Sequence, residues 1–259
     1  MANYDILGNI AIVKFPEESK RGEKLAKAHE LLKNKSIKTV LEKTDKVSGR
    51  LRTIKTKYIL GEKTKTAIYK ENGCLFKLNV ETCYFSPRLA NERLQVANMA
   101  RKGENVLVMF AGVAPFSIVL GKTAKPKKIF SVELGRECCR YAEENIVKNR
   151  VENIIEVLQG DVKRIIPRLD KQKEKFDFIV MPRPNLKDTF LKEALLVSKK
   201  GTRIVYYGFS PETKKDEMVE DLLRETKKYK RKVKIVRVLE AGDIAPYEHR
   251  YRVEMIVEN

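Results

Sequence analysis

The chain has 259 residues, of which 42% are hydrophobic, so it is long enough for a large domain and a small one with a sizeable core. Its formal net charge is +19 at pH 7, because 54 Lys and Arg residues outnumber 35 Asp and Glu residues. Ion pairs within the chain do not neutralise this excess, so we expect nucleic acid as a partner. A lysine- and glutamate-rich thermophilic composition is the alternative source of the charge.

Cysteine and histidine usage gives no sign of a metal site. The four cysteines form no C-x-x-C pair and there are only two histidines, so a zinc site is not expected and the thiols are expected to be reduced. The sequence shows no signal peptide and no long apolar run. We therefore expect a cytoplasmic protein with no membrane partner.

The first 80 residues predict a small α+β domain that carries many Lys and Arg residues. Apolar periodicity and turn residues define its elements. In chain order they are strand 8–15, helix 20–34, strand 37–41, and alternating segments 53–67 and 68–80 with a turn at 71–73.

The remainder, residues 81–259, alternates strands and helices, which predicts an α/β domain with a parallel sheet wound on both sides. A final antiparallel pair added to such a sheet is the Rossmann-like arrangement of methyltransferases. The expected strands are 105–109, 128–132, 154–159, 176–181 and 202–208, the expected helices are 89–101, 116–121, 136–149, 186–196 and 211–229, and the final pair is 232–240 with 251–257.

A ligand pocket is expected where consecutive strands of this sheet end. The loop at residues 110–115 keeps one glycine, Gly112, where a dinucleotide fingerprint would have three, and it is too short for a phosphate-binding loop. Glu133 ends the next strand, where a carboxylate can accept hydrogen bonds from both hydroxyls of a ribose. A ligand with a ribose but no pyrophosphate is therefore expected, and S-adenosylmethionine fits this description.

Polar or turn residues also follow the third and fourth strands. Asp161 could meet an adenine amino group, and Met181-Pro-Arg-Pro-Asn185 follows the fourth strand, where the reacting group would sit. Each position alone is more simply a turn or cap residue, but together they favour a pocket. The expected cofactor-binding residues are Phe110, Ala111, Gly112, Val113, Pro115, Glu133, Leu134, Asp161, Val162 and Met181.

The segment Ser86-Pro-Arg-Leu-Ala-Asn-Glu-Arg93 marks the start of a helix. Arg88 and Glu92 are four residues apart and share a helical face, so a routine salt bridge is the simple interpretation. The functional interpretation is that Arg88 binds an anion or a carbonyl while Glu92 acts as a general base. Methylation of a guanine ring nitrogen requires loss of its proton, which a neighbouring carboxylate can accept.

Several of these stretches resemble the archaeal and eukaryotic tRNA (guanine-37 N1)-methyltransferases, a class I family that uses S-adenosylmethionine. The family shares ancestry with the aminocarboxypropyl transferase of wybutosine synthesis. The resemblance covers nearly the whole chain and rests on Val47-Ser-Gly-Arg-Leu-Arg52, Glu71-Asn-Gly73, Phe85-Ser-Pro-Arg-Leu-Ala-Asn-Glu-Arg93, Phe110-Ala-Gly-Val113, Pro115-Phe-Ser117 and Ala245-Pro246.

The resemblance implies a role for each matching residue. Glu92 matches the general base, Arg88 and Arg52 match arginines that support the target guanosine, and Glu133 matches the acid on the cofactor ribose. It also implies a tRNA partner. Because this chain does not include the additional N-terminal domain of many members, we expect contact mainly with the anticodon arm at position 37, and we expect a monomer. The other residues expected at the reaction site are Pro182, Pro184, Arg93, Arg183 and Asn185.

Three positions depart from the family pattern. Val108 replaces an Asp of the first strand, Ala114 replaces a Gly, and Pro182 replaces the Asn of an Asn-x-Pro segment. Pro182-Arg-Pro184 resembles one archaeal subfamily that can be bifunctional. Its members make N1-methylguanosine and also methylate carbon 7 of 4-demethylwyosine to give isowyosine.

Three other functions compete with position-37 methylation. The aminocarboxypropyl relative shares the fold and the cofactor, but Arg88 and Pro182-Arg-Pro184 favour methyl transfer. A non-catalytic RNA-binding protein would account for Val108 and Ala114. A methyltransferase of small molecules is disfavoured by the positive charge.

Overall fold

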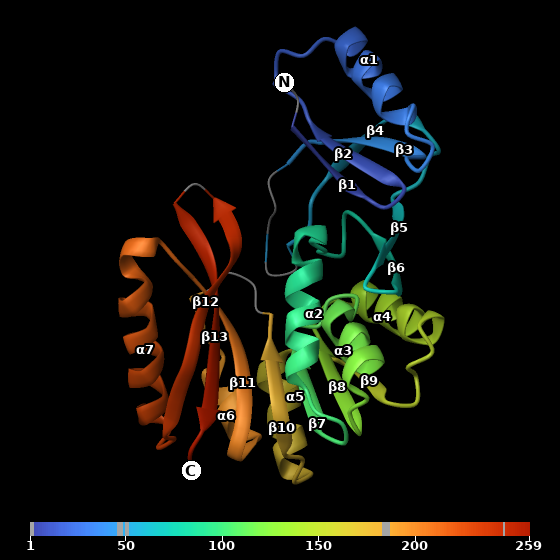
Figure 1. The fold of residues 1–259 in the computed structure, drawn as a ribbon. Helices are drawn as coiled ribbons and strands as arrows, with labels where there is room; N and C mark the ends of the chain where they lie inside the picture. Colours follow the sequence, from blue (N-terminus) through green and yellow to red (C-terminus); the bar gives the residue numbers. More distant parts are fainter. Residues whose placement is uncertain (1–2, 46–48, 50–51, 183–186, 246) are drawn as a thin grey trace.

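The computed structural model describes residues 3–45, 49, 52–182, 187–245 and 247–259. A small N-terminal unit, blue in Figure 1, lies at one end of a larger α/β unit. A two-stranded hairpin lies between them.

The N-terminal unit is a four-stranded sheet with one helix. Its strands, in the spatial order β1-β2-β3-β4, are β1 (Asn3–Leu7), β2 (Ile10–Lys14), β3 (Thr39–Lys43) and β4 (Thr56–Gly61). Helix α1 (Arg21–Leu32) connects the parallel strands β2 and β3, and its Ala28 and Leu31 pack with Val13 and Val40. The predicted α+β character is confirmed, whereas β1 is a strand that the sequence analysis did not predict.

The hairpin consists of β5 (Thr66–Glu71) and β6 (Cys74–Asn79), and its turn lies at the predicted place. Asn72 and Gly73 both have positive φ angles, of 48° and 68°, which a tight hairpin turn requires. The hairpin belongs structurally with the larger unit, because the side chains of Asn145 and Asn149 bond to the backbone of Lys77 and Leu75. The expected domain boundary after residue 80 stays a prediction.

Two contacts fix the N-terminal sheet against this hairpin. Gly8, in the β1–β2 turn, has φ +58°, and a Cβ there would lie 1.8 Å from the carbonyl oxygen of Ile68. Only glycine allows so close an approach of two backbones. The side chain of the neighbouring Asn9 then accepts a hydrogen bond from the Ile68 amide at 2.7 Å.

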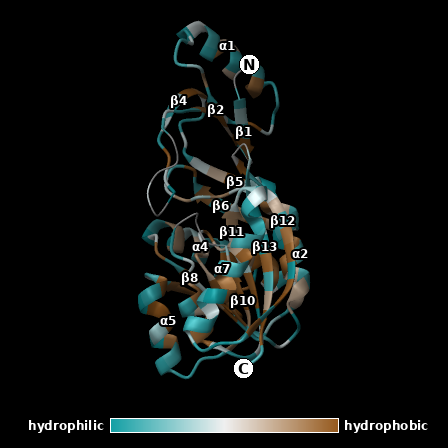
Figure 2. Ribbon diagram, turned by 90° about the vertical axis from the view of Figure 1, so that its left-hand side faces the viewer, coloured by the Kyte–Doolittle hydropathy of each residue, from teal (hydrophilic) through white to brown (hydrophobic). Residues whose placement is uncertain are grey.

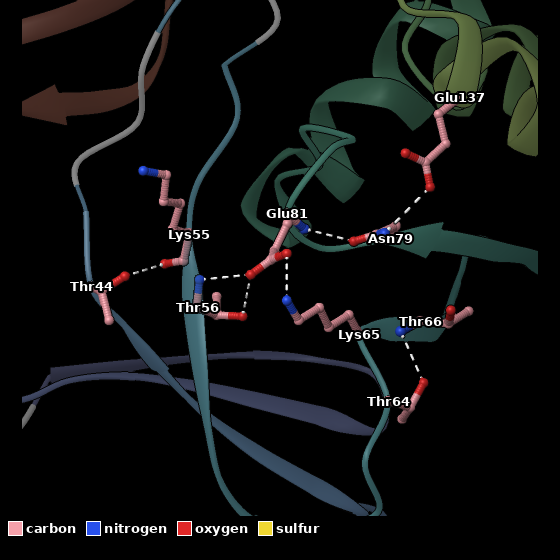
Figure 3. A network of polar contacts seen from close by, with 9 residues as sticks. All are labelled: Thr44, Lys55, Thr56, Thr64, Lys65, Thr66, Asn79, Glu81 and Glu137. Carbon is pink, nitrogen blue, oxygen red and sulfur yellow. Dashed lines mark hydrogen bonds and ion pairs between the residues drawn. The ribbon is translucent and has the colours of Figure 1, made fainter.

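Glu81 ties the linker, the hairpin and the N-terminal sheet together, as Figure 3 shows. Its carboxylate accepts from the amide and hydroxyl of Thr56 at 2.7 and 2.8 Å, and from Lys65 Nζ at 2.7 Å. Its own amide donates to Asn79, whose side chain donates to Glu137 of the larger unit. Burial alone would raise the pKa of Glu81, but the hydrogen bonds from Lys65 and Thr56 outweigh burial and lower it.

The larger unit is built on a seven-stranded sheet of order β12-β13-β11-β10-β7-β8-β9. The five strands from β11 to β9 are parallel, and β13 pairs antiparallel with both β11 and β12, which gives the terminal antiparallel pair predicted for a Rossmann-like methyltransferase. The strands are β7 (Asn105–Met109), β8 (Lys128–Glu133), β9 (Ile155–Gln159), β10 (Phe176–Met181), β11 (Ser198–Ser210), β12 (Val233–Ala245) and β13 (Glu248–Val257).

Helices cover both faces of this sheet (Figure 1). The helices are α2 (Ala90–Met99), α3 (Pro115–Ala124), α4 (Arg136–Lys148), α5 (Val162–Lys171), α6 (Leu191–Leu196) and α7 (Lys215–Lys228). Alternate residues of each strand pack to opposite sides: Leu107 joins a core with α5, α6 and α7, while Val108 joins a core with α2, α3 and α4. Figure 2 shows the apolar residues concentrated on the strands between these layers.

Two parts of the larger unit differ from expectation. Helix α5 was not predicted; Asp161 caps it by accepting from the Lys163 amide at 2.9 Å, and its Ile165 and Ile166 are buried although Pro167 lies inside the helix. The final hairpin is longer than predicted, and in Figure 1 its tip extends from the sheet toward the N-terminal unit. Among the described residues, no helix is long and apolar enough to cross a membrane.

Candidate active site

A pocket opens at the carboxyl ends of the parallel strands, on the side that faces the chain after the hairpin. Its lining comes from the loops after β7, β8, β9 and β10, and from the segment that leads into α2. The lining residues are Arg52, Tyr84, Phe85, Ser86, Leu89, Arg93, Phe110, Ala111, Gly112, Pro115, Phe116, Val132, Glu133, Leu134, Cys138, Gly160, Asp161, Val162, Pro182 and Phe190.

Most of the predicted cofactor-binding residues line this pocket, but two do not. Val113 is fully buried in the core that joins the N-terminal unit to α4. Met181 is fully buried in the core under α5 and α6. Successive side chains of a strand point to opposite faces of the sheet, and that of Met181 points to the face that α5 and α6 cover. Their side chains therefore support the pocket from behind.

Glu133 lies at the end of β8 with its carboxylate in the pocket wall. Oε2 accepts from the Gly112 amide and Oε1 accepts from the Gly135 amide, both at 2.7 Å. Burial raises the pKa of Glu133, and the hydrogen bonds from these backbone amides only partly oppose the rise. Each carboxylate oxygen has a second lone pair, so the group can still accept from the hydroxyls of a ribose.

The loop after β7 follows an unusual path. Phe110, Gly112 and Ala114 all have positive φ angles, of 61°, 57° and 64°. The left-handed conformation is costly for Phe and Ala, so the surrounding structure must impose it. It brings the Gly112 amide onto Glu133 and places Phe110 edge-to-face on Phe190, with ring centroids 4.8 Å apart.

Two of the departures from the family pattern lie outside the pocket lining. Val108 is buried in the core that contains α2 and α3, and Ala114 is buried at the residue before α3. Neither residue is among those that line the pocket. The pocket therefore keeps apolar walls and a carboxylate at the second strand, which together fit an adenosine group.

The chain just before α2 supplies the opposite wall. The guanidinium carbon of Arg52 lies 3.8 Å from the ring centroid of Tyr84, a stacking contact that the sequence analysis missed. The one available signal was the aromatic pair before Ser86. Next to it, Cys138 Sγ donates to Cys83 Sγ at 2.7 Å, which holds this segment against α4. The described cysteines are all buried free thiols, as expected.

Arg93, an expected substrate residue, is fully engaged by the protein. Its guanidinium pairs with both carboxylate oxygens of Glu71, each at 2.5 Å, and also donates to the Ser86 carbonyl at 3.0 Å. The side chains of Arg93 and Glu71 are 2% and 3% exposed. This buried pair joins the hairpin to α2, and a substrate-binding role for Arg93 stays a prediction.

Arg88 and Glu92 do not form the salt bridge that their spacing allows. The exposed Arg88 instead pairs with Asp5 of β1 at 2.7 Å. Glu92 faces the sheet, where Oε1 accepts from the Tyr207 hydroxyl at 2.6 Å and both its oxygens accept from one Arg252 nitrogen at 2.9 Å. Burial, followed by the charge of Glu92, raises the pKa of Tyr207 well above its usual value, so the hydroxyl keeps its proton.

Glu92 lies next to the pocket. Leu89 and Arg93, its neighbours at the start of α2, line the pocket. Tyr207, which donates to Glu92, packs on the lining residue Phe116 with ring centroids 6.0 Å apart. The sequence analysis missed Tyr207 and Arg252, since neither lies in a motif and Arg252 is 160 positions from Glu92.

Pro182 lines the pocket at the end of β10, where the reacting group was expected. The other residues predicted there, Arg183, Pro184 and Asn185, lie outside the described residues. Among the described residues, one group could bring three metal ligands together, namely Glu240, Asp243 and His249 in the final hairpin. This group is largely exposed and does not belong to the pocket lining. The expectation that the pocket binds no metal stays a prediction.

Comparison with known proteins identifies the family. The model of the TRM5/TYW2 methyltransferase domain matches residues 67–236, and the model of the TYW2 N-terminal domain matches residues 1–64. The chain belongs to the TRM5/TYW2 methyltransferase family. This confirms the resemblance stated from the sequence.

Three curated relatives illustrate the range of the TRM5/TYW2 family. The tRNA (guanine(37)-N(1))-methyltransferase Trm5b of Pyrococcus abyssi is 40% identical over 215 residues, which are 81% of this chain but only 61% of that protein. The tRNA (guanine(37)-N(1))/4-demethylwyosine(37)-methyltransferase Taw22 of Nanoarchaeum equitans is 31% identical over 98% of this chain and 99% of that protein. A Methanocaldococcus jannaschii aminocarboxypropyltransferase that acts on 4-demethylwyosine is 36% identical over 60% of this chain and 59% of that protein.

Solved structures of the family share the whole fold. The crystal structure of Pyrococcus abyssi Trm5b has a TM-score of 0.87 and 36% identity, over 99% of this chain and 75% of that chain. The complex of aTrm5 with tRNALeu has a TM-score of 0.85 and 25% identity, over 99% and 72% of the two chains. Pyrococcus horikoshii TYW2 in complex with MeSAdo has a TM-score of 0.83 and 25% identity, over 99% and 90%.

Proposed function

We propose that this protein is an S-adenosylmethionine-dependent methyltransferase that modifies position 37 of tRNA on N1 of guanosine. The observation that supports the proposal is the Glu92 carboxylate, which Tyr207 and Arg252 hold next to two residues, Leu89 and Arg93, that line a pocket suited to an adenosine group. The relatives named Trm5b and Taw22 support the reaction type. We also infer that the protein acts in the cytoplasm as a monomer and without a metal, and that it contacts the anticodon arm.

The cofactor-binding residues have separate tasks in this proposal. Glu133 would accept from the ribose hydroxyls, while Phe110, Leu134, Val162 and Phe190 would enclose the adenine between apolar side chains. S-adenosylmethionine, when bound, would supply a methyl group attached to a positively charged sulfonium sulfur, and the C–S bond would break with the neutral thioether as the leaving group.

Glu92 performs the proton transfer. Guanine N1 carries a proton at neutral pH, and its electron pair becomes available for a new bond to carbon only as that proton leaves. Glu92 would accept the proton while Pro182 packs beside the base at the end of β10. A correctly placed base contributes about 100- to 10,000-fold to such a step.

The arginines around the pocket would hold the tRNA. Arg52 stacks on Tyr84 at the pocket wall, where its edge can still donate to the target nucleotide. Arg88 is 77% exposed and paired with an exposed Asp5. Such surface pairs are worth little, so a phosphate can readily take the place of Asp5.

We infer that the same pocket also accepts 4-demethylwyosine and methylates its carbon 7. The Taw22 relative, whose whole length this chain matches, carries both activities in its name. Pro182 supports the inference, because it replaces an amide that would hydrogen-bond one particular base edge. A proline leaves a less polar wall that tolerates a larger ring.

Aminocarboxypropyl transfer is the alternative that a specific observation favours. The N-terminal model that matches residues 1–64 is that of TYW2, and an aminocarboxypropyltransferase is among the relatives. The two reactions use the same cofactor but add groups of different mass, so the product distinguishes them.

The test is nucleoside analysis by mass spectrometry after incubation with S-adenosylmethionine and tRNA that carries either guanosine or 4-demethylwyosine at position 37. We expect N1-methylguanosine from the first substrate and isowyosine from the second. Glu92→Gln should lower N1 methylation by about 100-fold or more while cofactor affinity changes little.

Three outcomes would contradict the proposal. Unchanged N1 methylation in Glu92→Gln would remove the general base. An aminocarboxypropyl product would favour the alternative. Binding of tRNA without any modified nucleoside would favour a non-catalytic RNA-binding protein. Glu156→Gln, an exposed carboxylate on β9 paired with Lys128, is the matched control and should keep full activity.

A further inference from the structure

We propose that Arg252, together with Tyr207, positions Glu92 to accept the N1 proton, and that both are positioning residues for the methylation. The inference rests on the function proposed above for Glu92. It is carried by a buried hydrogen-bond network between the first turn of α2 and the neighbouring strands β11 and β13.

The sheet register brings the two donors side by side. Tyr207 of β11 and Arg252 of β13 are directly opposite each other in an antiparallel pair, so their side chains lie on the same face of the sheet. That face packs against α2, where Glu92 and Gln95 are three residues apart and point the same way. Arg252 reaches both of them from one nitrogen, at 2.9 Å and 3.0 Å.

The two carboxylate oxygens of Glu92 accept different numbers of hydrogen bonds from Tyr207 and Arg252. Oε1 accepts from the Tyr207 hydroxyl at 2.6 Å and from Arg252 at 2.9 Å. Within the described part of the chain, Oε2 accepts one hydrogen bond, from Arg252 at 2.9 Å. A carboxylate oxygen has two lone pairs, so Oε2 is the oxygen with room for the N1 proton.

Arg252 remains compensated after the proton has moved. Its Nε donates to Glu254 at 3.0 Å, and the nitrogen that holds Glu92 also donates to Gln95. When Glu92 becomes neutral, the guanidinium therefore keeps a carboxylate partner and an amide partner. The side chains of Arg252, Glu92 and Glu254 are 6%, 11% and 12% exposed, so water does little to replace these contacts.

The proton balance of the step is simple. The N1–H bond breaks, its electron pair stays on the ring, and the proton bonds to Oε2. The hydrogen bonds from Tyr207 and Arg252 keep Oε1 fixed and therefore fix the plane of the carboxylate. Loss of either donor should displace the base, and a displacement of about 1 Å costs about 100-fold in rate.

The test is a double-mutant cycle measured as the single-turnover rate of N1 methylation at saturating tRNA and S-adenosylmethionine. Arg252→Met should lower the rate by about 10- to 100-fold. Arg252→Lys, which keeps the charge but not the shape, should recover part of the loss, and Tyr207→Phe should cause a smaller loss. The KM for both substrates should stay within about twofold, because these residues act on Glu92 and not on binding.

The decisive comparison uses the Glu92→Gln background. If Arg252 acts through Glu92, Arg252→Met should change the already slow rate by less than about twofold in that background. An equal loss in both backgrounds, or an unchanged rate in Arg252→Met alone, would overturn the inference. If Glu92→Gln itself keeps its rate, the proposed function of Glu92 fails, which is a separate result.

Two controls separate positioning from folding. Arg203→Met breaks a partly buried pair between Arg203 of β11 and Glu104, at the opposite end of α2 from Glu92, and should leave the rate per folded molecule unchanged. Arg252→Met leaves Glu254 without its partner, so Arg252→Met/Glu254→Gln is measured as well. If the rate loss disappears in this double variant while the fold is retained, the loss came from structure, and the inference is overturned.

Discussion

At the residue scale, the site holds two glutamates that have opposite kinds of support. Glu133 accepts hydrogen bonds from backbone amides in a buried wall, and burial raises its pKa. Glu92 is held by a cation and a hydroxyl. The first arrangement suits a hydrogen-bond acceptor for neutral hydroxyl groups, and the second suits an oriented proton acceptor.

Glu133 should make cofactor affinity depend on pH. A carboxylic acid with a raised pKa is partly protonated in mildly acidic solution, and the protonated group accepts hydrogen bonds from ribose hydroxyls poorly. We therefore expect the affinity for S-adenosylmethionine to fall as the pH is lowered from 7 toward 5. Isothermal titration calorimetry at several pH values measures this.

Glu133→Gln is the matching variant. It should bind S-adenosylmethionine about 10- to 100-fold more weakly at pH 7, because charged hydrogen bonds to the ribose are lost. It should also lose the pH dependence between 7 and 5. A variant that keeps the wild-type pH profile would show that another group is responsible.

At the element scale, hydrogen bonds and one close backbone contact join the N-terminal sheet, the hairpin and α4. The Gly8 turn, Asn9 and Glu81 bond the sheet to the hairpin and the linker, while Asn145 and Asn149 bond the hairpin to α4. These contacts orient the N-terminal unit relative to the pocket, and the exposed Arg88–Asp5 pair adds little to them.

Glu81 should contribute measurably to stability through this network (Figure 3). Glu81→Gln is expected to lower the free energy of unfolding by about 2 kcal/mol at pH 7, since hydrogen bonds to a charged and largely buried carboxylate are lost. Urea denaturation measures the difference. Glu30→Gln, which breaks an exposed pair with Lys27, is the control and should change stability by less than about 0.5 kcal/mol.

The contribution of Glu81 has a defined pH dependence. Its pKa in the folded protein is lowered, so the stabilisation is present above the ordinary value of 4.5 and is lost as the pH falls through the folded-state pKa. The difference between wild type and Glu81→Gln should therefore shrink in acid. A constant difference from pH 7 to pH 3 would contradict the role of the ionised carboxylate.

At the scale of the whole molecule, the net charge of +19 should dominate the capture of tRNA. Basic side chains that contact phosphates release counterions, so tRNA affinity should fall by about 100- to 1000-fold between 50 and 200 mM salt. Filter binding or fluorescence anisotropy measures this. Cofactor affinity over the same salt range is the internal control and should change little. If tRNA affinity also changes little, the positive charge is solvated surface without a role in binding.

The parallel sheet, the terminal hairpin, the Gly112 loop and the acids at the ends of β8 and β9 followed from the sequence. Their signals are local: apolar periodicity sets each strand, and parallel strands bring their carboxyl ends to one edge. Helix α5 escaped prediction because it contains Pro167, a residue that disfavours helix interiors, yet burial of Ile165 and Ile166 on one face maintains it. Tertiary packing thus outweighed the local signal.

The sequence by itself determined that Glu92 and Arg88 share a helix start beside a cofactor loop. Only the tertiary structure decided their partners: Arg88 meets Asp5, Arg93 meets Glu71, and Glu92 meets Tyr207 and Arg252. Spacing along a helix offers possible pairs. The buried charges of Arg93 and Glu92 are compensated by partners elsewhere in the chain, because an uncompensated buried charge is costly. The Arg88–Asp5 pair, in contrast, is exposed. The sheet register that sets Tyr207 opposite Arg252 is a property of the assembled fold, and no local pattern encodes it.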